Sequence, residues 1–163
     1  MRKLSLSVAI MSFVLSSSVQ PALAGEPLRV PLRAVHDVFA AGVVCPFAIA
    51  VDSVTQNETA TIFTNGRILI TGALTETITN LATNRSVVVN ASGPVKITGD
   101  SVVTVMAEGR GVFALFASDA GPSAPALLLT TGLVVVTIDG ATGRITSFVQ
   151  SGGTIENLCQ TLA

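Results

Sequence analysis

The chain contains no tryptophan and no tyrosine, and its only histidine is His36. The missing aromatic residues argue against carbohydrate recognition by aromatic stacking and against a contact surface rich in these two residue types. A single histidine and the absence of a Gly-x-Ser-x-Gly sequence argue against a Ser-His-Asp mechanism. Five phenylalanines of the mature chain are expected in the core. They are Phe47, Phe63, Phe113, Phe116 and Phe148.

Charge is also scarce, since only 12% of the residues are charged and the formal net charge is −1. The basic residues are scattered singly, whereas nucleic acid requires clustered lysine and arginine to displace its counterions. We therefore predict no nucleic-acid partner.

The first 24 residues have the three parts of a secretory signal peptide. Arg2 and Lys3 form the positive start, residues 4–15 are uncharged and mostly apolar, and the segment ends in Ala-Leu-Ala. We predict a signal peptide over residues 1–24, cleaved between Ala24 and Gly25, and a secreted, extracellular protein. The apolar run is shorter than the ~20 residues that span a bilayer. No apolar stop-transfer segment follows it, so no membrane span is expected in the mature chain.

The mature chain is predicted to be one domain preceded by an arm. Residues 25–43 contain Pro27, Pro31 and mixed charges, which favours an extended N-terminal arm with one helical turn near residues 34–41. Residues 44–163 show no internal repeat and no low-complexity linker, so they are assigned to a single β-domain.

Cys45 and Cys159 are the only cysteines. An even count in an exported protein predicts a disulfide, and closing so long a loop is worth roughly 4–5 kcal/mol in the chain-entropy model. Two cysteines and His36 cannot complete a zinc site without carboxylates, and no C-x-x-C is present. We expect no metal and no cofactor, and a catalytic Cys45–His36 pair is the remaining alternative.

Alternation of apolar and polar residues predicts short β-strands along most of the mature chain. The dipeptide Asn65-Gly66 is the strongest hairpin signal, because both residues tolerate positive φ. Three hairpins are expected, joining residues 59–64 with 67–71, 74–81 with 86–90, and 94–98 with 101–107. Residues 108–111 are interpreted as a turn, and residues 126–138 around Gly132 as either one bent strand or two.

The fold class that follows is all-β, an antiparallel meander of about 8–10 strands. A closed or partly closed up-and-down β-barrel would protect its edges, and a two-sheet β-sandwich is the alternative because it uses the same alternation. Thr154–Leu162 has a plausible N-cap and helical spacing of apolar residues, which predicts a short C-terminal helix.

Several short segments together resemble a family of small secreted two-cysteine β-domain proteins of actinomycete-type bacteria. The resemblance spans roughly residues 45–162 and implies a bacterial secreted context and the pair of cysteines that brackets the domain. It implies no activity and no catalytic residues. The segments are residues 79–81, 85–87, 90–94, 109–111, 131–134, 141–145 and 155–159.

Glu76 is the one candidate catalytic residue. In a strand over residues 74–80 it shares a face with Leu74, Ile78 and Asn80, whereas the opposite face carries threonines. If the Leu74 face points inward, desolvation would raise the pKa of Glu76 and suit it to acid–base chemistry or ligand contact. If the threonine face points inward, Glu76 is solvated. Glu58, Asp100 and Glu108 are available as a second carboxylate, but nothing in the sequence pairs them with Glu76.

These observations predict a secreted, non-enzymatic β-domain that binds a small apolar ligand or a macromolecular partner such as a protein. Barrels of about eight strands can hold one small ligand. One alternative is a structural or cell-surface-associated protein. The other is a lyase or isomerase that uses an interior carboxylate such as Glu76.

Overall fold

The computed structural model describes residues 25–163, and the predicted signal peptide and its cleavage site after Ala24 lie outside these residues. Twelve strands and one short helix make up the described chain. They are β1 (Leu28–Pro31), β2 (His36–Phe39), β3 (Ile49–Gln56), β4 (Thr59–Ile62), β5 (Ile68–Thr71), β6 (Leu74–Asn80), β7 (Ser86–Asn90), β8 (Val95–Thr98), β9 (Val102–Leu115), β10 (Ala126–Asp139), β11 (Ile145–Ser151), β12 (Ile155–Asn157) and α1 (Leu158–Thr161).

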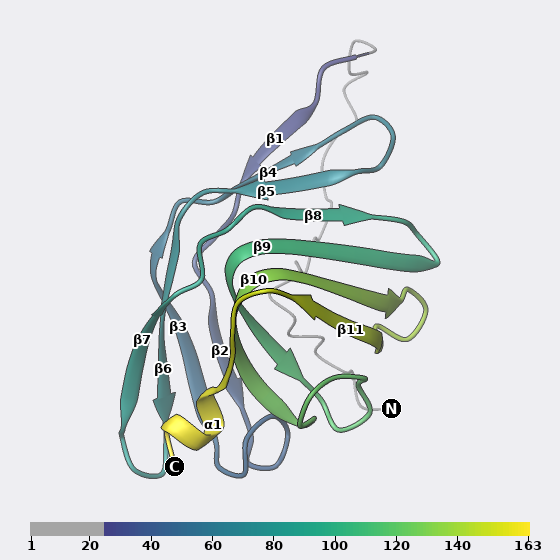
Figure 1. The fold of residues 1–163 in the computed structure, drawn as a ribbon. Helices are drawn as coiled ribbons and strands as arrows, with labels where there is room; N and C mark the ends of the chain where they lie inside the picture. The colour runs from purple at the N-terminus through teal and green to yellow at the C-terminus, as the bar shows by residue number, and fades with distance from the viewer. Residues whose placement is uncertain (1–24) are drawn as a thin grey trace.

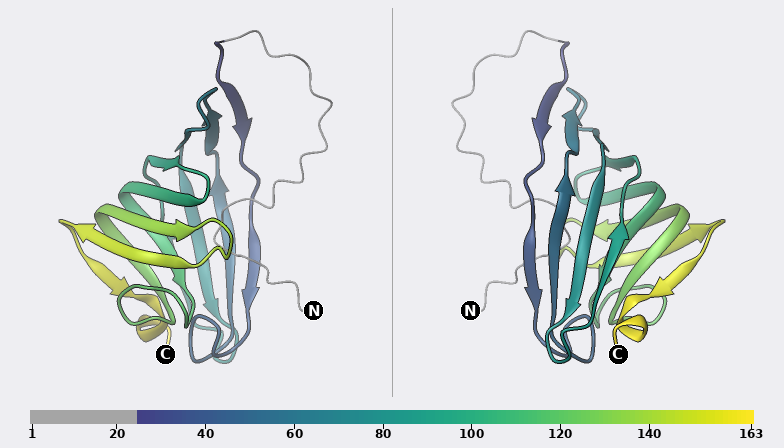
Figure 2. Two further views of the ribbon diagram at one scale, coloured as in Figure 1. Left: turned by 90° about the vertical axis from the view of Figure 1, so that its right-hand side faces the viewer. Right: turned by 90° about the vertical axis from the view of Figure 1, so that its left-hand side faces the viewer.

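The strands form two antiparallel sheets. Eight strands form one sheet in the order β1-β4-β5-β8-β9-β10-β11, with β12 also paired to β10, and four form the other in the order β2-β3-β6-β7. The strands of the smaller sheet run steeply across the direction of β9, β10 and β11 (Figures 1 and 2). The all-β antiparallel prediction is confirmed. Within residues 25–163 neither sheet closes on itself, so the closed barrel is corrected to two open sheets.

The chain follows a meander if each pair of consecutive strands that is separated by a short break is counted as one long strand. β1 with β2, β3 with β4, β5 with β6, and β7 with β8 each form one run that is divided between the two sheets. Each run pairs with the next one along the chain. The breaks are neighbours in space, because the N–H of Leu32 donates to the carbonyl of Glu58 at 2.9 Å. Likewise, the N–H of Asn57 donates to the carbonyl of Ala73 at 3.1 Å. A line of bends therefore divides one meander into two sheets.

The three predicted hairpins are present as β4–β5, β6–β7 and β8–β9. The turn predicted at residues 108–111 is wrong, because these residues lie inside β9. Gly109 lies opposite Gly132 of β10, and the two have φ values of 89° and 90°. A Cβ on Gly132 would lie 2.6 Å from the carbonyl oxygen of Gly152, so the backbones approach where only glycine fits. Positive φ here bends both strands instead of reversing the chain, and residues 126–138 form one bent strand.

Both ends of the described chain pair with distant strands. The predicted N-terminal arm contains β1, which pairs with β4, and β2, which pairs with β3, so the predicted helical turn is wrong. Residues 155–157 pair with β10, and the C-terminal helix is therefore reduced to residues 158–161. Asn157 rather than Thr154 is its N-cap, with its Oδ1 accepting from the N–H of Cys159 at 3.0 Å. Sheet pairing outweighs the local helix signal.

The predicted disulfide between Cys45 and Cys159 is confirmed, with a Cα–Cα distance of 5.4 Å. It excludes both the catalytic Cys45–His36 pair and cysteine ligation of zinc, because the two sulfurs are bonded to each other. The helix is also held by Asn80, whose Nδ2 donates to the carbonyl of Leu162 at 2.9 Å. A disulfide is typical of an oxidising compartment, as expected for an exported protein.

No helix within residues 25–163 is long and apolar enough to cross a membrane.

Two apolar clusters form the core. One joins β2, β3, β6 and β7 to β10 and α1, and the other lies among β9, β10 and β11. Four of the five phenylalanines predicted in the core pack against these clusters: Phe47, Phe113, Phe116 and Phe148. Phe63 instead lies beneath the guanidinium of Arg67 on the β4–β5 hairpin, 4.1 Å from ring centroid to charge centre.

Candidate functional site

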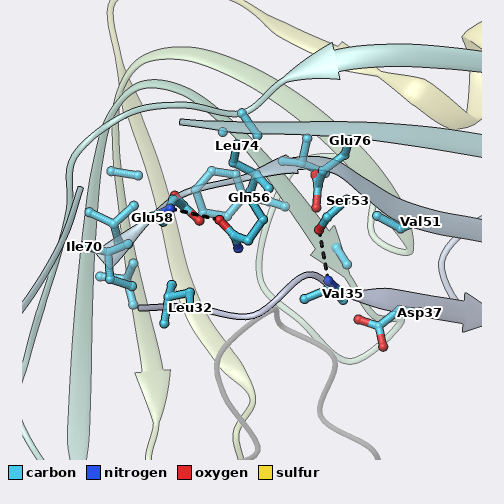
Figure 3. A pocket seen from close by; sticks show the side chains of 18 of the residues that line it. Leu32, Val35, Asp37, Val51, Ser53, Gln56, Glu58, Ile70, Leu74 and Glu76 are labelled. Carbon is cyan, nitrogen blue, oxygen red and sulfur yellow. Dashed lines mark hydrogen bonds between the residues drawn. The ribbon is translucent and has the colours of Figure 1, made fainter. Parts of the chain in front are cut away.

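A cavity of about 800 Å³ is lined by strands of both sheets. It lies along the line of bends, where the two sheets diverge, and Figure 3 shows side chains from several strands converging on it. Most of the lining is apolar. The apolar lining residues include Val51, Leu74, Val95, Val112 and Leu127.

Glu76 points into this cavity from the third position of β6. The structure turns the Leu74–Asn80 face inward, with Ile78 and Asn80 fully buried and Glu76 only 5% exposed. Its register partner on β3 is Ser53, which lines the same cavity, and Figure 3 shows the Glu76 carboxyl directed toward the Ser53 side chain. Of the two orientations that the sequence allowed, the inward one is therefore formed.

The Glu76 carboxyl has no hydrogen-bond partner among residues 25–163. Every fully enclosed side-chain nitrogen or oxygen in this part of the chain does have one. The oxygens of Glu76 therefore reach the open space of the cavity rather than being sealed in the core. Desolvation raises the pKa of Glu76 to about 7, and the nearby carboxylates of Glu58 and Asp37 add to this rise.

Glu58 approaches the same cavity from the break between β3 and β4. It is 7% exposed, its N–H donates to the Gln56 Oε1 at 3.1 Å, and its carbonyl accepts from the N–H of Leu32. The two hydrogen bonds fix the backbone of this break and set its side chain toward the interior (Figure 3). Burial raises the pKa of the Glu58 carboxyl, and hydrogen bonding by the Gln56 side chain offsets part of that rise.

Three further charged residues line the cavity. Asp37 on β2 is half-buried, whereas Arg33 and Arg110 are exposed and lie where the cavity meets solvent. Neither arginine forms an ion pair with a carboxylate among the described residues. Asp100 and Glu108, the other carboxylates weighed from the sequence, do not line this cavity. Glu108 instead lines a separate, smaller pocket with Lys96.

The exposed pair His36–Asp52 lies outside the cavity, on the outer side of β2 and β3. Asp52 raises the pKa of His36 by hydrogen bonding and by its charge. No group of three His, Cys, Asp or Glu side chains within residues 25–163 is placed to hold a metal ion. The site is therefore an apolar cavity with a carboxyl corner made by Glu76 and Glu58, and it can bind an organic molecule or move a proton.

Sequence reasoning identified Glu76 and named Glu58 as one of three available second carboxylates, but it did not pair the two and did not include Asp37. Glu58 looked like a turn residue next to Asn57, and Asp37 lay in the predicted arm. The signal that could have found Glu58 is its position at the break between β3, which pairs with β2 and β6, and β4, which pairs with β1 and β5. Using that signal requires the strand order to be known. No protein-family model, curated protein or solved structure matches the chain. The resemblance to small secreted β-domain proteins of actinomycete-type bacteria therefore stays a prediction.

Proposed function

We propose that this protein is a secreted, non-enzymatic β-domain that binds a small apolar ligand in the cavity between its sheets. The observation that carries the proposal is the cavity itself, about 800 Å³ in volume, with a mostly apolar lining that includes a few polar side chains. Small-molecule sites typically have about 300–1,000 Å³, apolar walls and a small number of placed polar groups. The disulfide supports export.

Binding is tested on the full chain, exported and processed by a bacterial host. Native mass spectrometry of the purified protein should show a non-covalent added mass, or the bare protein should bind the neutral fluorescent dye Nile red at one site.

A filled cavity should abolish this binding. Ala107 on β9 is buried and lines the cavity, so Ala107→Phe places an aromatic ring in the ligand's space. Val88→Phe is the matched control, since Val88 is 63% exposed on β7 and outside the cavity lining. We expect at least a tenfold loss of dye affinity in Ala107→Phe and none in Val88→Phe, with unchanged far-UV circular dichroism in both. Equal affinity in folded variants would refute the cavity as the binding site.

A second candidate function is a lyase or isomerase reaction, favoured by one observation. A carboxyl with a pKa near 7 inside a cavity has the properties of a general acid or base at neutral pH. If the molecule found by native mass spectrometry is converted on incubation, and Glu76→Gln stops conversion without releasing the molecule, the protein is an enzyme. If the molecule is recovered unchanged, the result favours the non-enzymatic ligand-binding protein.

A further inference from the structure

Within residues 25–163 the Glu76 carboxyl has no cation paired with it and no hydrogen-bond donor, and the Glu58 carboxyl has only the Gln56 side chain. Glu76 is nine-tenths buried or more, its carboxyl has no partner among residues 25–163, and Glu58 brings a second buried carboxyl close enough to affect its charge. Burying a carboxylate is costly unless an opposite charge or a donor compensates it. An occupant that supplies a positive charge at this corner would therefore be favoured over one that does not.

Other occupants of the corner fit less well. A metal ion lacks ligands, because no three His, Cys, Asp or Glu side chains of the described chain are placed around one point. An anionic ligand would be repelled by Glu76, Glu58 and the half-buried Asp37, and the only cations in the lining, Arg33 and Arg110, are exposed. A neutral alcohol would accept or donate one hydrogen bond without balancing charge.

We propose that the cavity selects apolar molecules that carry a protonated amine, with the ammonium group donating to the Glu76 carboxylate and Glu58 serving as a second acceptor. The apolar body of the ligand lies along the walls formed by β3, β8, β9 and β10. This inference rests on the proposed function, because it names the chemical class of ligand for the same cavity.

The test uses three probes with the same alkyl chain and different head groups: decylamine, decanol and decanoic acid. Each displaces Nile red from the exported full chain at pH 8, where the amine is protonated and the fatty acid is ionised. Charge-assisted hydrogen bonds contribute roughly 1.5–3 kcal/mol, so decylamine should compete at concentrations at least about tenfold lower than decanol. Decanoic acid should compete least.

Glu76→Gln isolates the charge, because glutamine keeps the shape of the side chain. This variant should lose the preference for decylamine over decanol and keep its affinity for decanol. Glu26→Gln removes the same charge from an exposed residue outside the cavity lining and should leave the preference unchanged. Glu58→Gln should lower the preference by a smaller factor.

The outcomes separate this inference from the proposed function. Equal competition by the three probes, stronger competition by decanoic acid, or an amine preference that survives in Glu76→Gln would overturn amine selectivity and leave ligand binding intact. If Nile red itself does not bind and no probe changes the native mass, the proposed function fails and the inference fails with it.

Discussion

Replacing Glu76 with glutamine should change how the stability of the protein depends on pH. The pKa of Glu76 is raised in the folded protein from 4.5 to about 7, mainly by desolvation. Between these two values the folded state binds more protons than the unfolded state, so the free energy of unfolding falls as pH rises. The stabilisation is fully present below pH 4.5 and is lost once the pH passes about 7.

The size of the effect follows from the shift. One pKa unit corresponds to about 1.4 kcal/mol, so Glu76 should cost the wild-type protein about 3 kcal/mol between pH 4.5 and pH 8. Glutamine has no charge to desolvate and removes this dependence. Glu58 and His36 also have raised pKa values, and they continue to lower stability with rising pH in the variant. The difference in slope between wild type and Glu76→Gln therefore reports Glu76 together with its electrostatic coupling to Glu58.

The assay is urea unfolding followed by far-UV circular dichroism, at intervals between pH 4.5 and pH 8. We expect the free energy of unfolding of Glu76→Gln to fall much less than that of wild type, and Glu26→Gln to follow wild type. The Glu76 side-chain carbon should also titrate near pH 7 by nuclear magnetic resonance. Parallel pH profiles for wild type and Glu76→Gln would refute the reasoning, because they would mean that the carboxyl is solvated in the folded protein.

Two further predictions concern the frame around the cavity. Replacing Cys45 and Cys159 together with alanine opens a loop of 114 residues and should lower the free energy of unfolding by roughly 4–5 kcal/mol in urea. A loss below about 1 kcal/mol would contradict the chain-entropy account. Gly132→Ala should be less stable than Gly152→Ala by roughly 1–3 kcal/mol in the same assay, because both have positive φ but only Gly132 has a carbonyl oxygen within 3 Å of the added Cβ. Equal losses would show that the strands can separate at the bend.

The hairpins could be predicted from the sequence because their signals are local. Asn65-Gly66 tolerates the backbone angles of a tight turn, and residues 86–90 place three consecutive valines, which favour strands, between two polar residues. The cysteine pair could also be predicted, since two cysteines in an exported chain have one pairing available within the chain.

The bends could not be predicted because they depend on neighbours distant in sequence. Gly109 reads as a turn residue, and only its position opposite Gly132 makes it a bend within a strand. Residues 155–157 have helical spacing, and only their hydrogen bonds to β10 make them a strand. The sequence allowed two orientations of Glu76 and favoured the solvated one, whereas the burial of Ile78 and Asn80 in the core turned Glu76 inward.

The all-β antiparallel class, the three hairpins and the disulfide followed from the sequence, because turn residues, two-residue periodicity and cysteine count act within short segments or by simple counting. The sequence also singled out Glu76 as the acid most worth testing. The division of one meander into two open sheets, the cavity along the line of bends, and the presence of Glu58 and Glu76 in the same cavity lining depend on tertiary structure. These features arise where the bends of successive runs lie side by side, and that alignment is a property of strand pairing rather than of any single segment.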